Sequence, residues 1–135
     1  MNKITSSRVL VPNKTSDDTH TADLTSTRFS PDGTSALTTS KDQTAILWNL
    51  QSFEPIATLR HPAKVNEGVF SADGSLVLTV SAEPKLRVWS AVNGDLLAIL
   101  NLAGETLKAG FSADGGSVFA ICQNVEKRAR LVFCN

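Results

Sequence analysis

The sequence carries no net charge and contains no long apolar run. Its 135 residues include 13 lysines and arginines and 13 aspartates and glutamates. A neutral chain lacks long-range attraction to phosphate backbones and anionic lipids, so we expect neither nucleic acid nor a membrane as its partner. The longest aliphatic run covers residues 96–100 and is too short to span a bilayer.

Cysteine and targeting signals are also scarce. Cys122 and Cys134 are the two cysteines, so the chain has no disulfide framework of the kind found in small secreted domains. Residues 1–7 contain no apolar segment typical of a secretory signal. We therefore expect an intracellular protein, located in the cytoplasm.

Motifs of common chemistry are missing as well. There is no G-x-S-x-G nucleophile elbow, no C-x-x-C pair and no G-x-x-x-x-G-K phosphate loop. The two cysteines are 12 residues apart with no histidine nearby, which does not suit a zinc site. We therefore expect no catalytic residues, no cofactor and no bound metal.

What the sequence does contain is an internal repeat. A Phe-Ser-x-Asp-Gly segment occurs three times, with a spacing of 41 residues. The segments begin at Phe29, Phe70 and Phe111. The same spacing separates Trp48 from Trp89 and His20 from His61. Three markers of different chemistry in one register indicate a repeat architecture.

Within each repeat the pattern predicts short β-strands. Residues 76–80 and 86–89 are rich in leucine, β-branched and aromatic side chains. Turn-forming residues separate such stretches, for example at 73–74, 83–85 and 93–95. No segment of a dozen residues has a sustained helical stripe. We therefore predict an all-β fold.

With these residues the chain resembles the WD-repeat family, whose blades are four-stranded antiparallel sheets around a central axis. The resemblance covers about residues 20–133 and implies three propeller blades in an incomplete ring. The expected blades are residues 21–60, 61–101 and 102–135. They follow an N-terminal segment, residues 1–20, with one short strand at Val9–Val11.

The family places a histidine, a Ser or Thr, an Asp and a Trp in one buried hydrogen-bonded set. Carried over, the first repeat has the set His20, Thr38 (or Ser40), Asp42 and Trp48. The second has His61, Thr79 (or Ser81), Glu83 and Trp89, and the longer glutamate implies a weaker network. In the third, Leu102, Ala120 and Asn124 stand at the corresponding places, and we expect Phe133 to take the role of the tryptophan.

Polar satisfaction explains why such a set is kept or lost together. A buried polar group without a partner costs about 1–3 kcal/mol, so the members should appear jointly or not at all. A histidine beside Asp42 and a hydroxyl also resembles a hydrolase triad. Because the group recurs with the repeat, we interpret it as a packing device and keep a histidine-dependent hydrolase as a further hypothesis.

Three blades would leave an apolar face at each end of the arc. Two explanations are open: two chains complete one ring, or the chain is a fragment of a longer protein whose other blades close it. In the first, Val9–Val11 of one chain would pair beside Arg130–Phe133 of the other. The basic cluster Lys127, Arg128 and Arg130 would either protect that sheet edge or bind a ligand.

The resemblance also implies a binding face built from the loops that enter the inner strands. Its candidate partner-binding residues are Asp23, Lys41, Lys64 and Glu105. Charges of mixed sign suit a protein or peptide partner. The function we predict is a non-catalytic protein–protein interaction scaffold, with self-association of the chain as one way to complete the ring. The alternative is a regulatory or sensory propeller portion of a larger multidomain protein, such as an enzyme.

Overall fold

The computed structural model describes the backbone of residues 20–102, 104–123 and 129–134, and the side chains up to residue 122. This part of the chain contains strands and turns and no helix. The predicted strand at Val9–Val11, Asn124 and the basic residues Lys127 and Arg128 lie outside the described residues.

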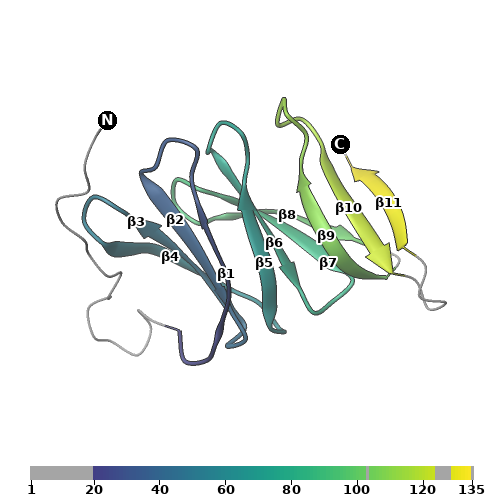
Figure 1. The fold of residues 1–135 in the computed structure, drawn as a ribbon, viewed down its shortest axis with the longest axis horizontal. Coiled ribbons are helices and arrows are strands. Elements are labelled where there is room, and N and C mark those ends of the chain that lie inside the picture. The colour runs from purple at the N-terminus through teal and green to yellow at the C-terminus, as the bar shows by residue number, and fades with distance from the viewer. Residues whose placement is uncertain (1–19, 103, 124–128, 135) are drawn as a thin grey trace, which may run out of the picture.

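Eleven strands form three antiparallel sheets that follow one another along the chain (Figure 1). The first sheet contains β1 (Leu24–Phe29), β2 (Ser35–Ser40), β3 (Thr44–Asn49) and β4 (Glu54–Arg60), in this order. The second contains β5 (Val65–Phe70), β6 (Leu76–Ser81), β7 (Lys85–Ser90) and β8 (Leu96–Asn101). The third contains β9 (Glu105–Phe111), β10 (Val118–Gln123) and β11 (Ala129–Cys134).

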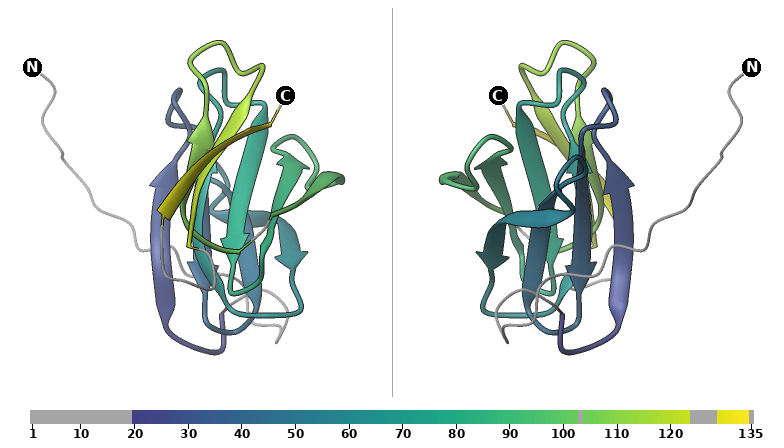
Figure 2. Two further views of the ribbon diagram at one scale, coloured as in Figure 1. Left: turned by 90° about the vertical axis from the view of Figure 1, so that its right-hand side faces the viewer. Right: turned by 90° about the vertical axis from the view of Figure 1, so that its left-hand side faces the viewer.

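The predicted all-β class and the antiparallel blades are thereby confirmed. The sheets lie one behind another and do not close into a ring, as the end-on views show (Figure 2). Two of them have the expected four strands. The third has three strands within the described residues, with β11 at its outer edge.

The Phe-Ser-x-Asp-Gly segments form the hairpin turn after the first strand of each sheet. In the second repeat, Asp73 Oδ1 accepts hydrogen bonds from the Ser71 hydroxyl at 2.8 Å and the Ser75 hydroxyl at 2.7 Å. The bond from the Ser75 backbone N–H, followed by those from the two hydroxyls, lowers the pKa of Asp73 to about 2. Gly74 has φ +77°, a conformation that glycine adopts without steric cost. The recurring motif is therefore explained by local turn chemistry.

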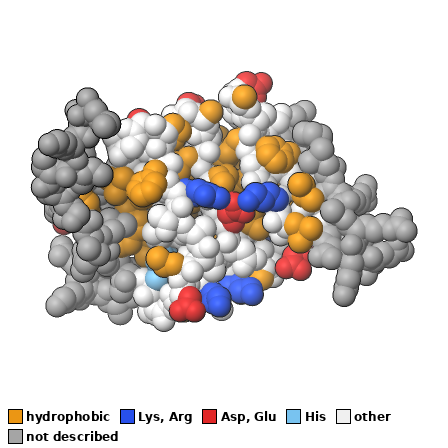
Figure 3. Space-filling model, viewed as in Figure 1, with side chains coloured by type: hydrophobic (Ala, Val, Ile, Leu, Met, Phe, Trp, Pro, Cys, Tyr) orange, Lys and Arg blue, Asp and Glu red, His pale blue; other side chains and the backbone are white. Residues whose placement is uncertain are grey.

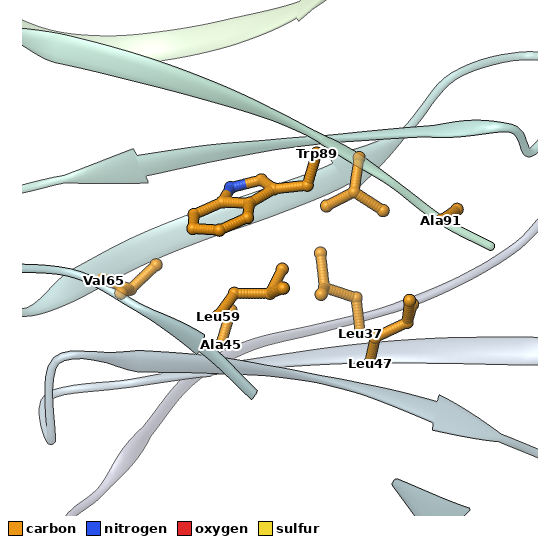
Figure 4. Close-up of a cluster of buried hydrophobic side chains, with 8 residues drawn as sticks. Leu37, Ala45, Leu47, Leu59, Val65, Trp89 and Ala91 are labelled. Atoms are coloured by element: carbon orange, nitrogen blue, oxygen red, sulfur yellow. The ribbon is translucent and has the colours of Figure 1, made fainter. Parts of the chain in front are cut away.

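The core lies between the sheets. One apolar cluster joins the first two sheets around Leu37, Leu47, Leu59, Val77 and Trp89 (Figure 4). A second cluster joins the second and third sheets, and it repeats several of these positions 41 residues later. Its members include Leu78, Val88, Val118, Ala120 and Cys122, with Leu100 packed against them. Burial of such side chains between sheets is the main term that stabilises the stack.

The register of β11 corrects one prediction. In the first two sheets each tryptophan lies opposite the second residue of the neighbouring strand or its equivalent: Trp48 pairs with Ala36 and Trp89 with Val77. The equivalent residue in the third sheet, Val118, pairs with Cys134, whereas Phe133 pairs with Phe119. The prediction that Phe133 takes the place of the tryptophan was therefore wrong. Because side chains alternate between the faces of a sheet, a shift of one residue moves Phe133 to the opposite face.

Buried hydrogen-bond sets and a charged rim

The structure brings the four polar residues of the first repeat together. The Trp48 indole N–H donates to Thr38 Oγ1 at 2.9 Å, and Thr38 Oγ1 lies 2.7 Å from His20 Nε2. On the other side of the ring, His20 Nδ1 lies 3.0 Å from Asp42 Oδ2. Three sequence elements therefore meet in one chain of hydrogen bonds: the segment before β1, strand β2 and strand β3.

The donor and acceptor roles in this chain follow from chemistry. An indole N–H can only donate, so the Thr38 oxygen accepts from Trp48 and its hydrogen is available for His20 Nε2. His20 Nε2 then acts as acceptor, which assigns the ring proton to Nδ1, the nitrogen facing the Asp42 carboxylate. A neutral histidine satisfies every member of the set.

Asp42 anchors the set from the turn between β2 and β3. Burial acts to raise the pKa of this carboxyl, but hydrogen bonds from Thr44, Thr21 and His20 outweigh it and hold the pKa below its usual value. The bonds from the Thr44 hydroxyl and the Thr21 backbone N–H measure 2.6 and 2.9 Å. The candidate Ser40 has a different role, since its hydroxyl donates to the backbone carbonyls of residues 22 and 23.

The second repeat keeps half of the arrangement. The Trp89 indole N–H donates to Thr79 Oγ1 at 2.9 Å, and Thr79 Oγ1 lies 2.8 Å from His61 Nε2. His61 Nδ1 faces the Leu59 carbonyl oxygen at 3.0 Å instead of a carboxylate. Burial, with a smaller contribution from the positive charge of Arg87, lowers the pKa of His61 to about 4. This histidine is therefore neutral at physiological pH.

Glu83 belongs to a different pair. Its carboxylate accepts from the Arg87 guanidinium and from the Ser81 hydroxyl, at 2.7 Å for the latter. The Arg87 bond, assisted by the one from Ser81, holds the pKa of Glu83 below its usual value against the effect of burial. Arg87 is 7% exposed, so the carboxylate is its main compensating charge. Sequence analysis did not identify Arg87, although its place in a predicted strand two residues before Trp89 was a signal for a buried charge.

The third repeat has apolar side chains at the matching positions. Leu102 and Ala120 stand where the first two repeats have histidine and threonine, and both belong to or pack against the second apolar cluster. Asn124 lies outside the described residues. Polar groups were thus lost together, which avoids a buried donor without an acceptor.

The four candidate partner-binding residues are all exposed at the ends where the chain enters the inner strands. Asp23 and Lys64 come directly before β1 and β5, and Glu105 is the first residue of β9. Lys41 Nζ lies 3.9 Å from Asp23 Oδ2, a solvent-exposed pair that contributes little to stability. The structure therefore places these charges along one rim of the stack, and Figure 3 shows acidic and basic side chains along the lower edge of this face.

A second charged group crosses the inner strands themselves. Glu67 Oε1 on β5 lies 3.1 Å from Arg28 Nη2 on β1 and 3.5 Å from Lys108 Nζ on β9. Figure 3 shows basic side chains on both sides of an acidic one at the centre of this face. Sequence analysis missed this ladder, although the spacing of 41 residues between Glu67 and Lys108 was visible. It ties the three sheets together on the side of the inner strands.

Stacked antiparallel sheets with His–Thr–Trp hydrogen-bond sets define the class of β-propeller blades. The family model described as "WD domain, G-beta repeat" matches residues 12–49 and 53–90. The chain belongs to this WD-repeat family, whose members generally mediate protein–protein interaction. A comparison with curated proteins finds no match for this chain.

The second family match begins just before β4 and ends with β7. One sequence repeat therefore takes the outer strand of one sheet and the three inner strands of the next, which links neighbouring blades covalently. Within the described residues there is no helix long and apolar enough to cross a membrane. The same part of the chain contains no group of three or more potential metal ligands.

Proposed function

We propose that this chain is a non-catalytic scaffold that binds other polypeptides through the flanks and the rim of its blade stack, and that it works in the cytoplasm. The observation that carries the proposal is the contrast between Phe29 and its repeat equivalents. Phe70 and Phe111 pack into the two inter-sheet clusters, whereas Phe29 on β1 is 65% exposed. A phenylalanine built to pack against a preceding sheet has no such sheet beside it in the described part of the chain.

The opposite flank has a matching feature. Thr25, at the bulge of β1, donates its hydroxyl to the Val65 carbonyl of the second sheet, so this position faces the next blade. Leu107 occupies the same bulge position in β9 and is 51% exposed. Large apolar side chains exposed at both ends of a stack mark surfaces suited to contact with other protein.

The buried sets support a structural role for both histidines. His20 and Thr38 are buried, and the Thr38 oxygen already accepts the Trp48 indole N–H. A hydroxyl held in this way is a poor nucleophile, because attack would require it to leave two hydrogen bonds and reach a substrate in the core. A histidine-dependent hydrolase is therefore the weaker hypothesis.

The specific association we propose is with a second copy of the chain. Two copies would supply six sheets, within the roughly four to eight blades of closed propellers. The flank with Phe29 would then pack on the flank with Leu107 of the other copy, in the way Phe70 packs between the first two sheets. Such a head-to-tail contact made twice closes a ring.

Sedimentation velocity across a concentration series tests this association. We expect a dimer for the parent chain and weaker association for Phe29→Ser and for Leu107→Ser. Val92→Ser is the matched control, because Val92 is equally exposed and apolar but lies in the turn between β7 and β8, away from both flanks. A compact monomer at micromolar concentration, or equal effects of all three substitutions, would refute self-completion.

The second candidate is a regulatory or sensory propeller portion of a larger protein. It is favoured by the third sheet, which has three strands in the described residues where its neighbours have four. A longer reading frame with further repeats would support it. In both cases the rim residues Asp23, Lys41, Lys64 and Glu105 are the surface to test for a protein or peptide partner, by charge reversal once a partner is in hand.

A further inference from the structure

The contact between the second and third sheets contains a cavity of about 190 Å³. We call it the aromatic socket and define it by six of its lining residues: Leu76, Val88, Ala98, Leu100, Phe111 and Val118. All six are apolar. The turn at residues 115–117 completes its lining.

The neighbouring contact shows what fills such a space. Five socket residues repeat, 41 positions later, residues of the cluster that contains Trp89: Leu47, Ala57, Leu59, Phe70 and Val77. Between the first two sheets the Trp89 indole lies among these side chains (Figure 4). The two sites are therefore built from equivalent positions, and one of them holds an aromatic ring.

The third sheet does not supply that ring. The position of Trp89 in the register, opposite Val77, corresponds in the third sheet to Cys134, opposite Val118. A cysteine is much smaller than a tryptophan, and close-packed interiors do not adjust fully when a large side chain is replaced by a small one. The cavity lies among the residues that would otherwise surround an indole.

From this we propose that the aromatic socket binds a phenyl ring, carried by a phenylalanine side chain of another polypeptide. A dry apolar cavity of this size is able to take a benzene-sized ring. The socket is accessible beside β8, an edge strand of its sheet, whose Leu97 and Ile99 are also exposed. This inference rests on the proposed scaffold function and names the chemistry of one contact.

The repeat also selects the type of ring. Trp89 satisfies its indole N–H with the Thr79 hydroxyl, and Ala120 occupies the equivalent position in the third sheet. An indole in the same pose would bury a donor without an acceptor, which a phenyl ring does not. We therefore expect toluene to bind about tenfold more tightly than indole.

Methyl-labelled NMR of the full chain tests the socket directly, with toluene as the probe. We expect saturable chemical-shift changes at the methyl groups of Val88, Leu100 and Val118. The equivalent methyl groups of Leu47, Leu59 and Val77 serve as an internal control and should not move, because Trp89 already fills their site. Absence of saturation, equal shifts in both sites, or indole binding as tight as toluene would overturn the assignment.

Matched substitutions test the volume argument. Ala98→Leu should fill the socket, weaken toluene binding about tenfold or more and leave the midpoint of thermal unfolding unchanged or higher. Ala57→Leu, at the equivalent position beside Trp89, should lower that midpoint because its site has no free volume. Equal effects of the two substitutions on thermal unfolding would contradict the proposal.

The source of the ring is tested by competition. A short peptide with a single phenylalanine should displace toluene, and the same peptide with leucine in its place should displace it less. Toluene binding without displacement by the phenylalanine peptide would reject the polypeptide partner. Ala98→Leu should leave the sedimentation of the chain unchanged, so failure of the socket and failure of the flank association are distinguishable.

Discussion

Acidification should destabilise the protein through His61. The folded-state pKa of this histidine is about 4, below the value of 6.5 expected in the unfolded chain. Between these values the unfolded state binds a proton that the folded state does not, so stability is complete above pH 6.5 and falls as pH decreases towards 4. With these two values the loss is about 2 kcal/mol at pH 5, about a fifth to a third of the free energy of unfolding of a typical domain.

The carboxylates titrate in a different window. Asp42 and Glu83 have pKa values below their usual values of 3.8 and 4.5, so their contributions are present above those values and are lost at lower pH. The interval between pH 6.5 and 5 therefore reports on histidine. The 7% exposure of His61 explains why solvent does not screen the effect.

Urea unfolding followed by tryptophan fluorescence, at fixed protein concentration and at several pH values from 7.5 to 5, measures this dependence. The control is His61→Gln, which keeps an acceptor for the Thr79 hydroxyl but cannot titrate. We expect the variant to be less stable at pH 7 and nearly independent of pH down to 5. The same slope in parent and variant would refute the assignment to His61.

Three further predictions concern single contacts, each measured by urea or thermal unfolding. Glu83→Gln should lower the free energy of unfolding by about 2–3 kcal/mol because Arg87 stays buried without its counter-charge, whereas Lys41→Gln in the exposed pair with Asp23 should change it by less than about 0.5 kcal/mol. Thr106→Val should raise it by about 1 kcal/mol, because the buried Thr106 hydroxyl has no hydrogen-bond partner in the described structure and Val65 occupies the equivalent position. Gly94→Ala and Gly33→Ala both place a side chain at positive φ, but the Gly94 substitution should cost about 1–3 kcal/mol more, because a Cβ there would lie 2.3 Å from the Cβ of Ala57 in the first sheet whereas Gly33 faces open space; equal losses would contradict the packing argument.

The hairpin turns and the strand order were accessible to sequence analysis because their causes are local. Asp73 and Gly74 are close in the chain to the groups they bond or turn, so their spacing alone predicts the hairpin. The 41-residue period then multiplied one reliable local pattern into a fold class. The grouping of His20, Thr38, Asp42 and Trp48 was also implied before the structure, through resemblance to a family.

Other features depended on register and on distant side chains. A single-residue shift in the pairing of β10 with β11 placed Cys134, not Phe133, opposite Val118, and such a shift leaves no mark on composition or period. Glu83 pairs with Arg87 because that guanidinium lies within reach and the backbone carbonyl of Leu59 already serves His61. The socket between the second and third sheets exists only as a relation between two contacts in space.

The amino-acid sequence by itself determined the repeat, the turns and the antiparallel blades, because each depends on residues near one another along the chain. The tertiary structure decided which side chains meet across the sheets: the exposed Phe29, the Arg28–Glu67–Lys108 ladder and the aromatic socket. These features arise where surfaces from different repeats pack together, and packing responds to the shape and volume of every neighbour at once.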